Sequence, residues 1–117
     1  MKIFHVSQRA EQEGGEFVLG SRDTGTHACY MIYGTLGPLE DGRLINPGKG
    51  HEEILMVTLG ELKLSGPGLA PVKELTLPQG SAVLIQGDRE CFLRNDTQKE
   101  AAYVCSGGHT SVDGHGH

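Results

Sequence analysis

The apolar residues of this chain occur in short runs separated by glycine-containing turns, and this pattern restricts the available folds most strongly. Eighteen of the 117 residues are glycine, about twice the roughly 7% that is usual in proteins. Pairs such as Gly37-Pro38 and Asp41-Gly42 supply the backbone angles that tight turns need. No segment has a sustained 3.6-residue apolar period, so the pattern predicts an all-β fold. The predicted strands are residues 16–19, 27–36, 43–46, 53–59, 61–64, 72–77, 82–85, 91–94 and 101–105.

Strands of this length and spacing are typical of a sandwich or barrel, which we expect to span residues 16–106. The polar residues 1–15 are predicted to form a loose arm or a short edge strand, and the Gly- and His-rich residues 107–117 a flexible tail. Residues 54–57 are apolar on both faces of the pleat. One face can fill the barrel, while the other must pack on a second sheet or another subunit. We therefore expect a homodimer.

Charge and cysteine content exclude several classes of protein. The net charge is −5 and the pI about 5.6, with no cluster of Lys or Arg, so a nucleic-acid partner is not expected. The apolar runs fall short of the ~20 residues that span a bilayer, so no membrane partner is expected. The first residues lack the apolar core of a signal peptide, which predicts a cytoplasmic location. Three cysteines without a close pair predict neither a disulfide framework nor a zinc knuckle.

Two stretches carry a family resemblance. Residues 46–61 (NPGKGHEEILMVTLGE) resemble the first motif of the cupins, in which two His, a Glu and a Gly follow one another; Glu53 and Gly60 match its second half. Residues 80–95 (GSAVLIQGDRECFLRN) are similar to the second cupin motif, and Asn95 takes the place of its asparagine. The resemblance implies a double-stranded β-helix (jelly-roll barrel), often dimeric, with a site in the barrel mouth. Gly60 is expected in a tight turn with positive φ.

The metal ligands of the family are mostly replaced in this chain. Aligned on Glu53, the two histidines of the first motif fall at Pro47 and Lys49, and the histidine of the second motif falls at Cys91. The usual metal site is therefore absent, but His51 shares a strand face with Glu53. His51, Glu53 and Cys91 are predicted to form an altered site for a divalent transition metal (Fe, Mn, Ni, Cu or Zn). The alternatives are a degenerate site that lines a pocket for a small polar molecule, and a His51 that is simply exposed at the loop rim.

Two cations complete the candidate pocket. Lys49 and Arg43 at the barrel mouth would recognise a carboxylate or phosphate of a small molecule, unless they are ordinary solvated charges. The prediction for function is a cupin barrel that binds a small polar molecule. A metal-dependent enzyme of the dioxygenase or isomerase type and an accessory subunit that acts through its dimer surface remain alternatives, so whether the chain is an enzyme stays open. The tail histidines (His109, His115 and His117) are expected to bind Ni or Zn only weakly.

Overall fold

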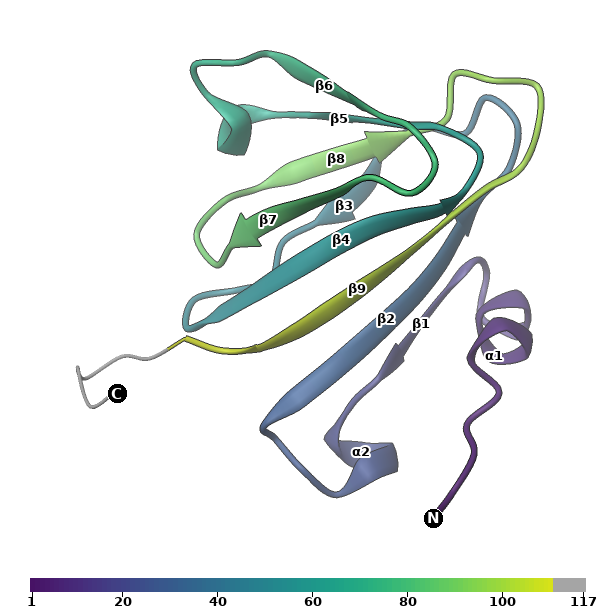
Figure 1. Ribbon diagram of the computed structural model, residues 1–117, viewed down its shortest axis with the longest axis vertical. Helices are drawn as coiled ribbons and strands as arrows, with labels where there is room; N and C mark the ends of the chain where they lie inside the picture. Colours follow the sequence, from purple (N-terminus) through teal and green to yellow (C-terminus); the bar gives the residue numbers. More distant parts are fainter. Residues whose placement is uncertain (111–117) are drawn as a thin grey trace.

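The computed structural model describes residues 1–110, and within this range nine strands form two antiparallel sheets that face one another (Figure 1). The five-stranded sheet has the order β1-β2-β9-β4-β7 and the four-stranded sheet the order β3-β8-β5-β6. The elements are α1 (Val6–Gln12), β1 (Glu16–Leu19), α2 (Ser21–Thr24), β2 (Cys29–Leu36), β3 (Arg43–Ile45), β4 (His51–Leu59), β5 (Leu62–Ser65), the 3-10 turn η1 (Pro67–Leu69), β6 (Glu74–Leu77), β7 (Ala82–Gln86), β8 (Cys91–Arg94) and β9 (Ala101–His109). The all-β prediction is confirmed.

The core lies between the two sheets because strands such as β4, β5 and β8 bury every second residue. In β4, Glu53, Leu55 and Val57 are buried, whereas Ile54 and Met56 are exposed. The buried residues of β4 and β9 pack against those of β5 and β8 from the opposite sheet. Ile54 and Met56 therefore leave an apolar outer face on the larger sheet, as expected for a strand that is apolar on both sides. The homodimer stays a prediction.

The turn between β4 and β5 needs its glycine. Gly60 has a φ of +73°, and a Cβ there would lie 3.1 Å from the Glu100 carbonyl oxygen. Both the backbone conformation and the close approach disfavour any side chain. The expected positive φ at this motif position is confirmed.

The predicted boundaries of the barrel need two corrections. Residues 1–15 are not a loose arm or edge strand, because residues 6–12 form the helix α1 against β1. Ala10 is fully buried and the Arg9 guanidinium lies 4.5 Å from the centre of the Phe17 ring, so this short helix covers an apolar residue of β1. At the other end, β9 continues to His109, so residues 107–109 belong to the barrel and not to a tail. Residues 111–117 of the predicted tail lie outside the described residues.

None of the helices within residues 1–110 has the length and apolar character that crossing a membrane would require.

Candidate functional site

The mouth of the barrel contains a cavity of about 510 Å³. It lies where β2 and β4 begin and β9 ends, and the segment 18–27 forms its other wall. The ends of β2, β4 and β9 lie side by side at this edge of the sheet in Figure 1. Four side chains carry its chemistry, namely Tyr30, His51, Glu53 and His109. We call these four residues the mouth cluster.

Glu53 is the buried acid of the mouth cluster. Only 4% of its surface is exposed, and the Tyr30 hydroxyl donates a hydrogen bond of 2.5 Å to its Oε2 atom. Tyr30 and Glu53 are on strands that both pair with β9, and Gly107 lies between them in register with each. A Cβ at position 107 would lie 2.4 Å from the Tyr30 Cζ and 2.9 Å from the Glu53 Cγ. The phenol ring therefore reaches Glu53 across β9 only because residue 107 is glycine.

Two histidines lie on the same face beside this pair. His51 and His109 are in register across β4 and β9, and their ring centres are 4.6 Å apart. The Tyr30 ring is 5.9 Å from that of His51 and nearly perpendicular to it. His51 thus joins Glu53 at one site, as the shared strand face predicted. The sequence prediction places His109 in the tail. Gly107 and Gly108 are the signal for a strand instead, because glycine is required where atoms of a neighbouring strand come very close.

Two acidic groups near Glu53, the Tyr30 phenol and the Cys105 thiol, have raised pKa values. Burial, and then the Glu53 carboxylate, raise the pKa of Tyr30. Burial and the same carboxylate also raise the pKa of the Cys105 thiol, which lies fully buried on the inner face of β9. Both groups therefore keep their protons to a higher pH than an ordinary tyrosine or cysteine does.

Cys91 does not line the mouth cavity. It is buried on β8 and lines a separate cavity of about 250 Å³, with which the mouth cavity shares no residue. Burial raises the pKa of its thiol, Glu90 adds to this, and Arg89 opposes it. The expectation that Cys91 shares a cavity with Glu53 is wrong, because β8 belongs to the other sheet and turns this residue toward β5 and β7.

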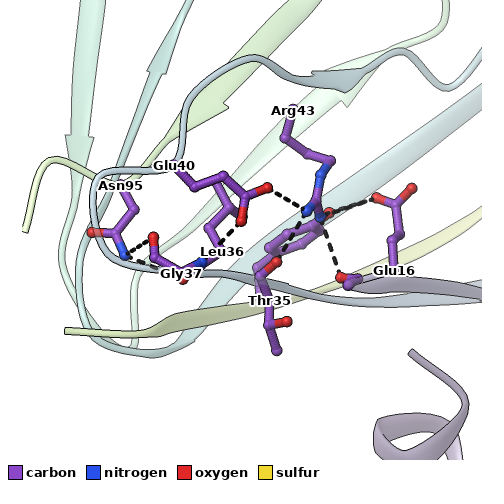
Figure 2. Close-up of polar contacts among 9 residues, drawn as sticks. Glu16, Thr35, Leu36, Gly37, Glu40, Arg43 and Asn95 are labelled. Atoms are coloured by element: carbon purple, nitrogen blue, oxygen red, sulfur yellow. Dashed lines mark hydrogen bonds and ion pairs between the residues drawn. The ribbon is translucent and has the colours of Figure 1, made fainter. Parts of the chain in front are cut away.

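The two predicted cations are also elsewhere. Lys49 is exposed and lines a separate depression of about 570 Å³ that shares only His51 with the mouth cavity. Arg43 is mostly buried and bound within the protein, as Figure 2 shows: it donates to the Thr35 carbonyl oxygen (3.0 Å) and to Glu40 Oε2 (3.0 Å). It also donates to the Tyr103 hydroxyl (3.0 Å). Arg43 therefore stabilises the barrel wall, and its hydrogen bonds are used there rather than for a ligand.

The residues of this chain do not fit the metal site that the resemblance to the cupin motifs implies. Of the family's ligand positions, Pro47 offers no ligand atom, Lys49 is exposed, and Cys91 lies in the other cavity. Within residues 1–110, no three His, Cys, Asp or Glu side chains are placed so that they could hold a metal ion together. The predicted set of His51, Glu53 and Cys91 is thus not assembled, and the chemistry of the mouth cavity is that of hydrogen bonds and proton-bearing side chains.

Raising the pH is expected to destabilise the fold. Cys105 and Tyr103 are fully buried and have raised pKa values, for Tyr103 through burial and Glu16. Each keeps its proton in the native state at a pH where the unfolded chain has lost it, which lowers the free energy of unfolding by about 1.4 kcal/mol per pH unit. The loss begins above roughly pH 9 for the thiol and roughly pH 10 for the phenol.

Urea unfolding between pH 8 and 10.5 measures this loss. The variant Cys105→Ala should show a shallower pH slope, whatever its absolute stability. A stability that does not change over this range would contradict the burial of these two protons.

Comparisons with known proteins identify the fold. No family model matches the chain, and no curated protein does. A cupin protein from Bacteroides fragilis superimposes with a TM-score of 0.69 at 12% identity, over 96% of this chain and 84% of that chain. The Cupin_2 domain of an XRE family transcriptional regulator from Enterobacter cloacae has a TM-score of 0.64 at 20% identity, over 82% and 98%. Oxalate oxidase in complex with the substrate analogue glycolate has a TM-score of 0.65 at 25% identity; 81% of this chain is covered, but only 51% of the oxidase.

These likenesses extend over most of this chain, 96% of it for the first protein and 82% for the second. The predicted jelly-roll barrel is confirmed. The chain is therefore a small domain with the cupin fold.

Proposed function

We propose that the mouth cavity binds a small polar organic molecule. The observation that carries the proposal is the hydrogen bond from Tyr30 to the buried Glu53, in a cavity of about 510 Å³ beside two imidazoles. A volume in this range suits a small ligand, and a few convergent polar groups are what orients one. A buried carboxylate that is held by a tyrosine would select a hydroxyl or amine donor on the ligand.

The two histidines suit the other end of such a ligand. His51 is half-buried and His109 exposed, so their ring nitrogens can meet an acceptor such as a carboxylate or carbonyl oxygen. A small hydroxy acid combines both features. Glycolate, the molecule bound in the oxalate oxidase structure, is such an acid and supports this choice of ligand class.

A titration followed by two-dimensional amide NMR tests the proposal. The probes are glycolate, a set of larger hydroxy acids, and their neutral alcohol counterparts. We expect saturable shifts at Tyr30, Glu53 and His109. The affinity should fall about tenfold in Glu53→Gln, which loses the charge-assisted hydrogen bond to the ligand, and in Tyr30→Phe, which loses the hydroxyl that positions the carboxylate. Glu61→Gln, an exposed acid in the turn after Gly60, is the control and should bind like the parent. Binding that is unchanged in Glu53→Gln, or absent for every probe, would contradict the proposal.

A metal-dependent enzyme of the dioxygenase or isomerase type is the second candidate, favoured by the likeness to oxalate oxidase. It is the weaker of the two, since Cys91 and the mouth cluster line different cavities. Metal content of the full-length chain decides between them, measured by mass spectrometry on a variant with His115→Ala and His117→Ala. Near-stoichiometric Fe, Mn, Ni, Cu or Zn that is lost in Glu53→Gln would favour the enzyme.

A further inference from the structure

A second cavity lies at the side of the barrel, between β6 and β7. It has a volume of about 250 Å³, and Leu64, Ile85 and Cys91 form its buried floor. Among the described strands, β6 pairs only with β5 and β7 only with β4, so the cavity lies between the edges of the two sheets. In Figure 1, β6 lies beside β5 at the top of the view and β7 lies lower, beside β4.

The wall of this cavity is held in place by two hydrogen bonds to backbone carbonyl oxygens. The Gly68 amide of η1 donates to the Glu90 carbonyl oxygen (2.9 Å), and Arg89 Nη1 donates to the Gly68 carbonyl oxygen (2.9 Å). A Cβ at position 68 would lie 2.8 Å from the Glu90 oxygen, so only glycine allows this approach. The turn η1 is thus fixed to the β7–β8 loop, and the cavity is formed before any ligand arrives. Preformed sites lose less conformational entropy on binding.

The opening of the cavity is apolar, with one cation at its rim. Val72, Leu75 and Leu84 are exposed to 48%, 36% and 56% around it. Apolar side chains that gather around an opening, rather than being scattered, are a sign of a binding surface. The polar lining residues are Gln86 and Arg89, no carboxylate side chain lines the cavity, and Arg89 forms no ion pair with any described residue.

From this chemistry we propose that the β6–β7 cavity is a second binding site, which takes a small organic acid with an apolar body. The apolar body would occupy the space above Leu64 and Ile85, and the acid would pair with the Arg89 guanidinium at the rim. The volume is below the roughly 300–1,000 Å³ of pockets for drug-sized ligands, which restricts the body to a short alkyl chain or a single ring. This site is independent of the mouth cavity, since the two share no lining residue.

Octanoate is the probe for this site, with octanol as its neutral counterpart. In amide NMR titrations of the full chain we expect saturable shifts for octanoate at residues of η1, β6 and β7. Octanol should bind at least tenfold more weakly. Arg89→Gln should weaken octanoate by a similar factor and should weaken octanol much less, since octanol has no charge to pair with the guanidinium. Val83→Phe should abolish octanoate binding because the larger ring fills the cavity.

Leu44→Phe provides the matched control, since Leu44 is an exposed apolar residue of β3 that does not line the cavity. It should bind octanoate like the parent, and so should Glu53→Gln, which alters only the mouth cluster. Thermal unfolding of each variant shows that it is folded. The proposal is overturned if octanoate causes no saturable shifts at the cavity, if octanol binds as tightly, or if Arg89→Gln leaves the affinity unchanged.

Discussion

The variant Asn95→Asp is expected to lose about 3–5 kcal/mol of the free energy of unfolding, the loss typical of a buried charge without a partner. Asn95 is 1% exposed and lies at the end of β8. Its Nδ2 atom donates to three carbonyl oxygens, those of Leu36 (3.2 Å), Gly37 (3.0 Å) and Lys99 (2.7 Å). Figure 2 shows the amide turned toward the backbone at Leu36 and Gly37. Aspartate has the same shape, but it would place a carboxylate oxygen against all three carbonyls.

The control for Asn95→Asp is the same substitution at Asn46, where only the side-chain oxygen forms a hydrogen bond. Asn46 accepts from the Gly48 amide through its Oδ1 atom (3.1 Å), and aspartate keeps that acceptor. Asn46→Asp should therefore change the unfolding free energy by less than about 0.5 kcal/mol. Urea unfolding of both variants at pH 7 gives the comparison. A loss of less than about 1 kcal/mol in Asn95→Asp would mean that water or backbone movement satisfies the three carbonyls.

The variant Gly34→Ala is expected to lose about 3 kcal/mol, because the Tyr103 ring lies directly over this residue. A Cβ at position 34 would lie 2.3 Å from the Tyr103 Cζ and 2.4 Å from its hydroxyl oxygen. Tyr103 is fully buried, and its hydroxyl donates to Glu16 and accepts from Arg43. The ring cannot move without breaking both contacts, so overpacking and lost hydrogen bonds add together.

A double-mutant cycle separates this clash from a general effect of alanine in a strand. Tyr103→Leu alone should be destabilising, but Gly34→Ala should cost much less in the Tyr103→Leu background, giving a coupling energy of about 1–3 kcal/mol. Gly37→Ala is the control, since the nearest atom to its added Cβ is Glu40 Oε1, at an ordinary contact distance of 3.9 Å. Additive losses in the cycle would show that the ring and residue 34 are not in contact.

The same arrangement occurs twice in the larger sheet. At one end Gly34 lies between Glu16 and Tyr103, and at the mouth Gly107 lies between Glu53 and Tyr30. In each case a tyrosine side chain passes over a glycine on the middle strand, and its hydroxyl donates a hydrogen bond to a glutamate two strands away. The first pair is combined with Arg43 and stabilises the wall, whereas the second has no cation among its described contacts and faces a cavity.

Much of the fold of this protein could be predicted from local patterns in its sequence. The apolar runs and turns predicted an all-β barrel, and the period of two put Glu53 on the inner face together with His51. Gly60 and Asn95 could be placed from the sequence because the role of each is local. Gly60 adopts a positive φ, and Asn95 forms part of the turn that follows β8. The helix α1 was missed because seven residues with a single buried side chain, Ala10, show no periodic signal.

Only the tertiary structure decided which side chains meet. Alternation determines the face on which a residue lies, but the register between strands that are distant in sequence determines its neighbours. His51 meets His109 because β4 pairs with β9, and Cys91 is turned into a different cavity because β8 joins the other sheet. Arg43 was predicted to bind a ligand, but its guanidinium donates a hydrogen bond to the Tyr103 hydroxyl, sixty residues away in the chain. Contacts of this kind depend on the packing of the whole barrel, and for that reason no local pattern in the sequence reveals them.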